Sequence, residues 1–108
     1  MDRGDLERLR EAGTETTFDA GHVLIERGQH GAGLFVILEG TVAVEAPEAS
    51  RELGPGSVVG ERALVSSDGR RTARVRAVTD VRVLAIDRAA FEELCAADPG
   101  LDGRVSAF

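Results

Sequence analysis

The chain has 108 residues, enough for one domain with one hydrophobic core. Its 19 acidic and 13 basic residues give a formal net charge of −6, which argues against a general binder of nucleic acid or anionic membranes, because both need a positive field. The single cysteine, Cys95, excludes an internal disulfide and a protein iron–sulfur centre, and it is typical of a reducing, cytoplasmic compartment.

The N-terminal segment predicts a short amphipathic helix over Asp5–Ala12. Leu6, Leu9 and Ala12 recur at helical spacing with charged residues between them, and Gly13 is a plausible stop. The polar stretch from Met1 to Thr17 does not resemble a signal peptide. No apolar run approaches the ~18 residues of a membrane span, so no membrane-spanning segment is expected.

Short apolar and β-branched runs follow, each bounded by glycine or proline. They predict strands over His22–Ile25, Leu34–Leu38 and Thr41–Glu45, with a turn over Ala46–Ser50. Leu53–Gly56 predicts a second sharp turn, and Val58 and Val59 lead into a very short helix over Glu61–Val65.

The second half predicts two further strands and a closing helix. The strands are expected over Thr72–Thr79 and Val81–Ile86. Asp87 is a good N-cap for a helix over Arg88–Ala97, which Asp98–Gly100 ends. The resulting class is mainly β: an antiparallel β-roll (a double-stranded β-helix, jelly-roll-like) with a short inserted helix and helices at both ends.

Strand parity singles out one arginine. Ala73, Val75 and Ala77 share one face of the predicted strand, which should be the core, whereas Arg74 and Arg76 should face water. Arg71 has the parity of the core residues and should point inward. A buried arginine needs an anion, because an unpaired buried charge costs several kcal/mol.

A suitable anion site lies nearby in the sequence. The short helix after Gly60 would present free backbone N–H groups, and Thr72 would add a hydroxyl. Glu61 repels a phosphate but accepts hydrogen bonds from a pair of hydroxyls, so a ligand with both groups, such as a cyclic nucleotide, satisfies Glu61 and Arg71. The residues also allow an alternative, in which Glu61 and Arg71 form a plain internal ion pair in a domain that binds nothing.

These residues resemble the cyclic nucleotide-binding domain of catabolite-activator regulators, cyclic-nucleotide-dependent kinase regulatory subunits and cyclic-nucleotide-gated channels. The resemblance runs from about Phe18 to Leu94, with Gly21, Gly28 and Gly40 at the family's glycine positions and Leu53–Gly56 at its turn. Its specific part is the phosphate-binding cassette: Gly60-Glu61, the apolar turn Ala63–Val65, a loop, then Arg71-Thr72-Ala73.

The resemblance implies a non-catalytic regulatory module whose ligand is cAMP or cGMP, with no metal and no other cofactor. Arg71 is expected to hold the exocyclic phosphate oxygens and Glu61 the ribose 2′-hydroxyl, while backbone groups around Gly60–Ala63 and the Thr72 side chain complete the cradle. The expected cyclic nucleotide-binding residues are Gly60, Glu61, Arg62, Ala63, Arg71, Thr72 and Ala73.

Three features depart from the family. Arg62 stands where an apolar residue is common, only Leu101–Phe108 follows the last predicted helix, and no helix-turn-helix segment follows the domain. Residues 1–108 are therefore expected to form one cyclic nucleotide-binding domain with a short or absent lid helix and no DNA-binding domain. A fused or associated effector domain is a candidate partner, and no direct contact to nucleic acid or membrane is expected.

Two other interpretations remain open. A ligand-free relative of the same fold would act as a structural or interaction module, which Arg62 and the missing lid favour and the intact Glu61 and Arg71 oppose. A metal-dependent β-barrel enzyme of the cupin kind would need clustered ligands, which His22 and His30 do not supply. The residues do not decide between adenine and guanine.

Overall fold

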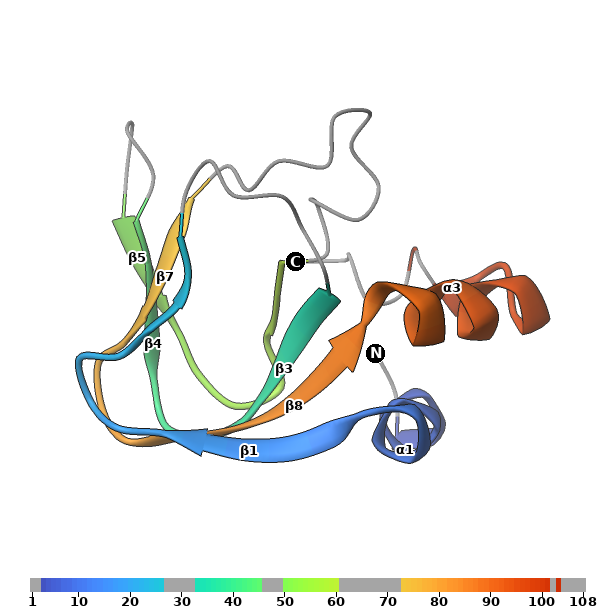
Figure 1. Ribbon diagram of the computed structural model, residues 1–108, viewed down its shortest axis with the longest axis horizontal. Helices are drawn as coiled ribbons and strands as arrows, with labels where there is room; N and C mark the ends of the chain where they lie inside the picture. The colour runs from blue at the N-terminus through green and yellow to red at the C-terminus, as the bar shows by residue number, and fades with distance from the viewer. Residues whose placement is uncertain (1–2, 27–32, 46–49, 61–72, 102, 104–108) are drawn as a thin grey trace.

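Two four-stranded antiparallel sheets form the body of the molecule (Figure 1). The computed structural model describes residues 3–26, 33–45, 50–60, 73–101 and 103. The first sheet, here the β8 sheet, has the order β1 (Thr14–Phe18), β8 (Val81–Asp87), β3 (Gly33–Glu39), β6 (Val58–Val59). The second, the β7 sheet, has the order β2 (Val23–Ile25), β7 (Arg74–Ala77), β4 (Val42–Glu45), β5 (Ser50–Leu53). The predicted mainly-β antiparallel roll is confirmed.

Apolar side chains from both sheets meet between them in an inter-sheet core. Alternate residues along each strand point to opposite faces, so every second residue enters this core. Its buried members are Ile25, Ile37, Val42, Val59, Val75, Ala77, Val81 and Val83.

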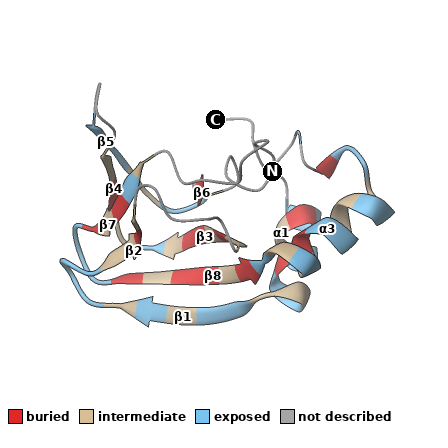
Figure 2. Cartoon of the chain, turned by 45° about the horizontal axis from the view of Figure 1, so that its top comes forward, coloured by how far each residue is buried: buried red, intermediate tan, exposed pale blue. Residues whose placement is uncertain are grey.

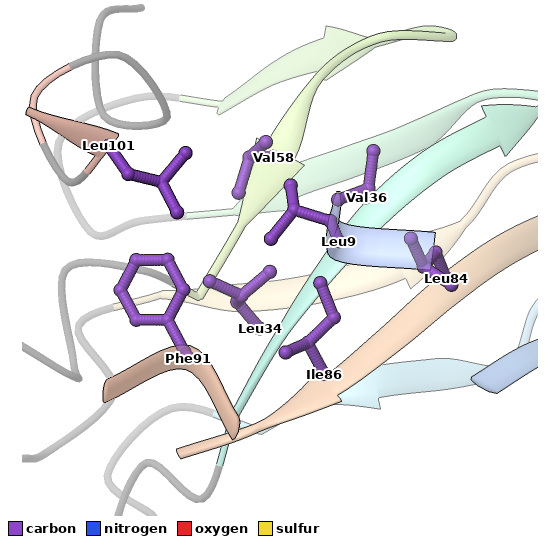
Figure 3. Close-up of a cluster of buried hydrophobic side chains, with 8 residues drawn as sticks. All are labelled: Leu9, Leu34, Val36, Val58, Leu84, Ile86, Phe91 and Leu101. Carbon is purple, nitrogen blue, oxygen red and sulfur yellow. The ribbon is translucent and has the colours of Figure 1, made fainter. Parts of the chain in front are cut away.

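The other face of the β8 sheet packs against helices α1 (Arg3–Ala12) and α3 (Arg88–Ala97), which lie at the end away from the β7 sheet (Figure 1). We call this cluster the helix-side core (Figure 3). It consists of Leu9, Leu34, Val36, Val58, Leu84, Ile86, Phe91 and Leu101. Strands β8 and β3 are therefore apolar on both faces, whereas the edge strand β1 is largely exposed (Figure 2).

The predicted N-terminal and C-terminal helices are both present, and their ends are capped as the sequence indicates. The Asp87 side chain accepts a hydrogen bond from the Ala90 N–H at 2.8 Å, which satisfies a free donor in the first turn of α3. At the other end, the Asp98 N–H donates to the Leu94 carbonyl at 2.9 Å. The N-terminal helix begins slightly earlier than predicted, at Arg3.

Three strands were not predicted, and all lie at sheet edges: the two-residue β6 (Val58–Val59), which was predicted only to lead into the short helix, and two polar segments. Thr14–Phe18, placed within a polar N-terminal segment, forms β1 and pairs with β8 from Thr14↔Ala85 to Phe18↔Val81. Ser50–Leu53, whose two end residues were assigned to predicted turns, forms β5 and pairs with β4. Both segments lack the alternating apolar pattern because an edge strand exposes much of its surface, so their polar side chains hid them.

Candidate functional site

The predicted cassette occupies the connection between the two sheets. β6 ends at Val59 in the β8 sheet and β7 begins at Arg74 in the β7 sheet, so the intervening chain must cross from one sheet to the other. Gly60 opens this connection with a φ of +95°, in the left-handed region that strongly favours glycine. Ala73 closes it, partly buried, one residue before β7.

Of the predicted site residues, the structure therefore places Gly60 and Ala73, at the two ends of the crossing. Glu61, Arg62, Ala63, Arg71 and Thr72 lie outside the described residues, as does the predicted short helix over Glu61–Val65. Their contacts with a ligand stay predictions.

The strand parity that predicts an inward Arg71 is present along the described part of β7. Val75 and Ala77 are buried in the inter-sheet core. The Arg74 and Arg76 side chains lie on the opposite face and pair with acidic residues. Arg74 Nε lies 2.9 Å from Glu26, just after β2, and an Arg76 terminal nitrogen lies 3.5 Å from Glu45 of β4. An inward Arg71 would extend the parity of Val75 and Ala77 beyond the start of the strand.

Sequence reasoning missed one arginine that the strand register places on the inner face. Arg51 in β5 stands opposite Val44 in β4, which in turn stands opposite Val75 in β7. Directly opposed residues of an antiparallel pair share a face, so Arg51 shares the face of Val44 and Val75.

Arg51 lies at the open margin of that face, because β5 is the edge strand and the residue is exposed. It forms no ion pair with any residue that the structure describes, unlike Arg74 and Arg76 on the outer face of the same sheet. The signal that could have found it is its parity with Leu53, a spacing that the predicted turn concealed.

The clearest electrostatic perturbation lies elsewhere, on the surface of the β8 sheet. The Arg82 guanidinium bridges Glu39 at 2.7 Å and Glu15 at 3.0 Å, across strands β3, β8 and β1. The hydrogen bond from Arg82, together with its charge, lowers the pKa of Glu39, and the same contact raises the pKa of Arg82. This is a surface ion-pair network of the scaffold and belongs to neither core.

Other site classes find little support in the described part of the chain. No group of three or more His, Cys, Asp and Glu residues there is arranged to hold a metal ion. No helix among the described residues is long and apolar enough to cross a membrane.

Comparison with known proteins adds a family match. A sequence model of the family described as "Cyclic nucleotide-binding domain" matches residues 15–98. The chain is similar to a cyclic nucleotide-gated potassium channel of Mesorhizobium japonicum, with 41% identity over 83 residues that cover 77% of this chain and 23% of the channel. It is also similar to cGMP-dependent protein kinase 2 of Homo sapiens, with 31% identity over 70% of this chain and 11% of the kinase. The chain thus spans a small part of the length of these relatives.

Solved structures agree with the fold. A structure from work on "A cyclic-GMP-dependent signalling pathway regulates bacterial phytopathogenesis" superposes with a TM-score of 0.87 and 28% identity, covering 99% of this chain and 89% of that one. The Thermus thermophilus catabolite activator protein superposes with a TM-score of 0.80 over 99% of this chain and 52% of its own; at 24% identity this likeness bears on the fold alone.

Proposed function

This chain belongs to the cyclic nucleotide-binding domain family, and we propose that it binds a 3′,5′-cyclic nucleotide, cAMP or cGMP, as a regulatory module with no catalysis of its own. One observation carries the proposal. The matched range includes the whole crossing from Gly60 to Ala73, and that crossing holds Gly60-Glu61 and Arg71-Thr72-Ala73 in the family's order.

In the proposed site Arg71 binds the cyclic phosphate through two parallel N–H donors, which suit phosphate oxygens better than the point charge of a lysine. Glu61 accepts from the ribose 2′-hydroxyl. The Gly60–Ala63 backbone, including the position of Arg62, and the Thr72 side chain complete the phosphate cradle. Ala73 leaves room for the ligand beside the first residue of β7.

We further propose that Arg51 contacts the base. It supplies donors only, and guanine presents two adjacent acceptors, O6 and N7, that a guanidinium binds in a bidentate manner. Adenine presents N7 beside an amino donor, which meets the guanidinium unfavourably. Arg51 therefore favours cGMP over cAMP in the proposed site.

The module is proposed to control an effector on the same or an associated chain, in a reducing, cytoplasmic setting consistent with the single thiol of Cys95. The relatives support this, because they include a channel and a protein kinase, in each of which the matching segment is a minor part.

Isothermal titration of the purified chain with cAMP and with cGMP tests the proposal. We expect saturable binding of at least one nucleotide at a stoichiometry of about one per chain. Absence of heat and of any shift in melting temperature with both nucleotides would instead favour the ligand-free interaction module.

A further inference from the structure

Arg8 of α1 contacts two carboxylates at once, one on its own helix and one at the end of α3. One terminal nitrogen of its guanidinium pairs with Asp5, and the other lies 3.0 Å from the Asp98 carboxylate. Asp5 is fully buried, and Asp98 is partly buried, with 27% of its side chain exposed. Arg8 thus joins the helix that precedes the β8 sheet to the C-cap of the helix that follows it.

This ionic clamp, formed by Asp5, Arg8 and Asp98, holds a turn that completes the helix-side core. The Asp98 carbonyl accepts from the Leu101 N–H at 3.0 Å, and its side chain accepts from the Gly100 N–H at 3.3 Å. Leu101 is fully buried in the same core as Leu9, the neighbour of Arg8 in α1 (Figure 3). The ion pairs of Arg8 and the apolar core shared by Leu9 and Leu101 therefore hold the same junction, between α1 and the turn after α3.

The same core reaches the strand that leads into the proposed nucleotide site. Val58 of β6 is buried in the helix-side core with Leu9 and Leu101, and β6 ends one residue before Gly60 (Figure 3). A change in how α1 and the turn after α3 pack would alter the support of Val58, and through it the start of the crossing.

We propose that Arg8 is a positioning residue for the nucleotide site: its clamp keeps the helix-side core in one arrangement and so pre-organises the start of the crossing at Gly60. The part that concerns the nucleotide rests on the proposed function. The mechanism is electrostatic, because removing the guanidinium leaves two carboxylates, one fully buried, facing the same space with one fewer cation, and like charges repel.

Arg8→Ala should therefore loosen the junction and lower the fraction of molecules in the binding-competent arrangement, which raises the apparent dissociation constant in proportion. We expect weaker nucleotide binding by about three- to thirtyfold. Adding Asp98→Asn to Arg8→Ala should recover much of the loss, because one of the repelling charges is gone while the amide oxygen can still accept from Gly100. Loss of side-chain packing alone predicts no such rescue.

Arg10→Ala is the matched control. Arg10 lies on the same helix, is about as exposed as Arg8, and approaches Glu15 of β1 at 3.8 Å. Its removal changes the net charge by the same amount, so an effect of general charge would appear in both variants.

The test combines two measurements on each variant. Spin labels at Glu7→Cys of α1 and Glu93→Cys of α3, both exposed positions, report the interhelix distance in a Cys95→Ala background without nucleotide, and titration with cGMP and cAMP reports affinity. We expect a narrow distance distribution in the parent chain and in Arg10→Ala, a broad one in Arg8→Ala, and a narrower one in Arg8→Ala with Asp98→Asn, with affinities in the same order.

An Arg8→Ala distribution as narrow as that of the parent, or a double variant no better than Arg8→Ala, would overturn the clamp. Unchanged nucleotide affinity in a clearly loosened Arg8→Ala would overturn its link to the site. If the parent binds neither nucleotide, the proposed function fails and with it that link, whereas the ligand-free distances still decide whether the clamp exists.

Discussion

Arg51 stands directly opposite Val44 in the β4–β5 ladder, so its side chain leaves the β7 sheet on the face that Val44 turns toward the inter-sheet core. Arg51 thus lies on the inner margin of the β7 sheet, whereas Arg74 and Arg76 pair with carboxylates on its outer face. This register is the observation on which the proposed contact between Arg51 and the base rests.

Arg51→Ala should reduce affinity for cGMP by about 1–3 kcal/mol, the value of one bidentate contact to guanine, and affect cAMP less. The unsubstituted chain should accordingly prefer cGMP by about five- to 150-fold. Titration of both nucleotides into both proteins measures this. Arg74→Ala, an exposed arginine on the outer face of the same sheet, serves as control. Equal losses for cAMP and cGMP in Arg51→Ala would remove Arg51 from base recognition.

Gly40 should be far more sensitive to alanine than Gly21, although both have a left-handed backbone, with φ of +88° and +91°. A Cβ at Gly40 would overlap with the Asp80 carbonyl oxygen, whereas a Cβ at Gly21 meets nothing within 4 Å. We expect Gly21→Ala to lower the free energy of unfolding by about 1 kcal/mol and Gly40→Ala by about 3 kcal/mol or more. Urea denaturation separates the two, and equal losses would mean that backbone strain alone acts at Gly40.

The ion pair of Glu39 and Arg82 predicts a pH dependence of stability. Since the hydrogen bond from Arg82 lowers the pKa of folded Glu39 below its ordinary value of 4.5, Glu39 stabilises the fold above that pH, and the contribution is lost as pH falls through the lowered pKa. Glu39→Gln should therefore reduce the melting temperature at neutral pH and flatten its fall in acid.

The control for this pair is Glu11→Gln, which removes an exposed carboxylate that pairs with no described residue. Melting temperatures should be measured from neutral to acid pH. Those of Glu39→Gln and the parent should differ only above the pH range in which Glu39 becomes protonated. A Glu39→Gln profile parallel to the parent profile at every pH would contradict the assignment.

Local patterns predicted the elements whose side chains carry a strong signal. Val75 and Ala77 alternate with charged residues, and Asp87 precedes a clear amphipathic run, so β7 and α3 could be read directly. β1 and β5 could not, because edge strands expose polar side chains and their pairing depends on partners distant in sequence. Asp5 is the sharpest case: a carboxylate within a charged helix gives no sign of complete burial, which arises from its pairing with Arg8 and the packing of α1 on the body.

The candidate site likewise contains residues that the sequence predicted and one, Arg51, that it did not. The ordered cassette residues identified the family from the sequence, because their types and spacing are specific even without a fold. Arg51 lies earlier in the chain, and its place on the inner face of the β7 sheet follows only from the β4–β5 register, which no linear motif encodes.

The most direct test of the account compares Arg71→Ala with Arg70→Ala in one calorimetric titration series with cAMP and cGMP. Arg71 is predicted to face inward onto the phosphate. Arg71→Ala should therefore weaken the free energy of nucleotide binding by about 2–5 kcal/mol, as for one partner of a buried charge pair. Arg71→Lys should also weaken binding, because the bidentate fork is lost. Arg70 has the opposite strand parity, so Arg70→Ala should weaken the free energy of binding by less than about 1 kcal/mol. Unchanged melting temperatures would show that all three variants fold. Nucleotide binding by the parent with a selective loss in Arg71→Ala is the predicted result, and equally tight binding by Arg71→Ala and Arg70→Ala would contradict the account.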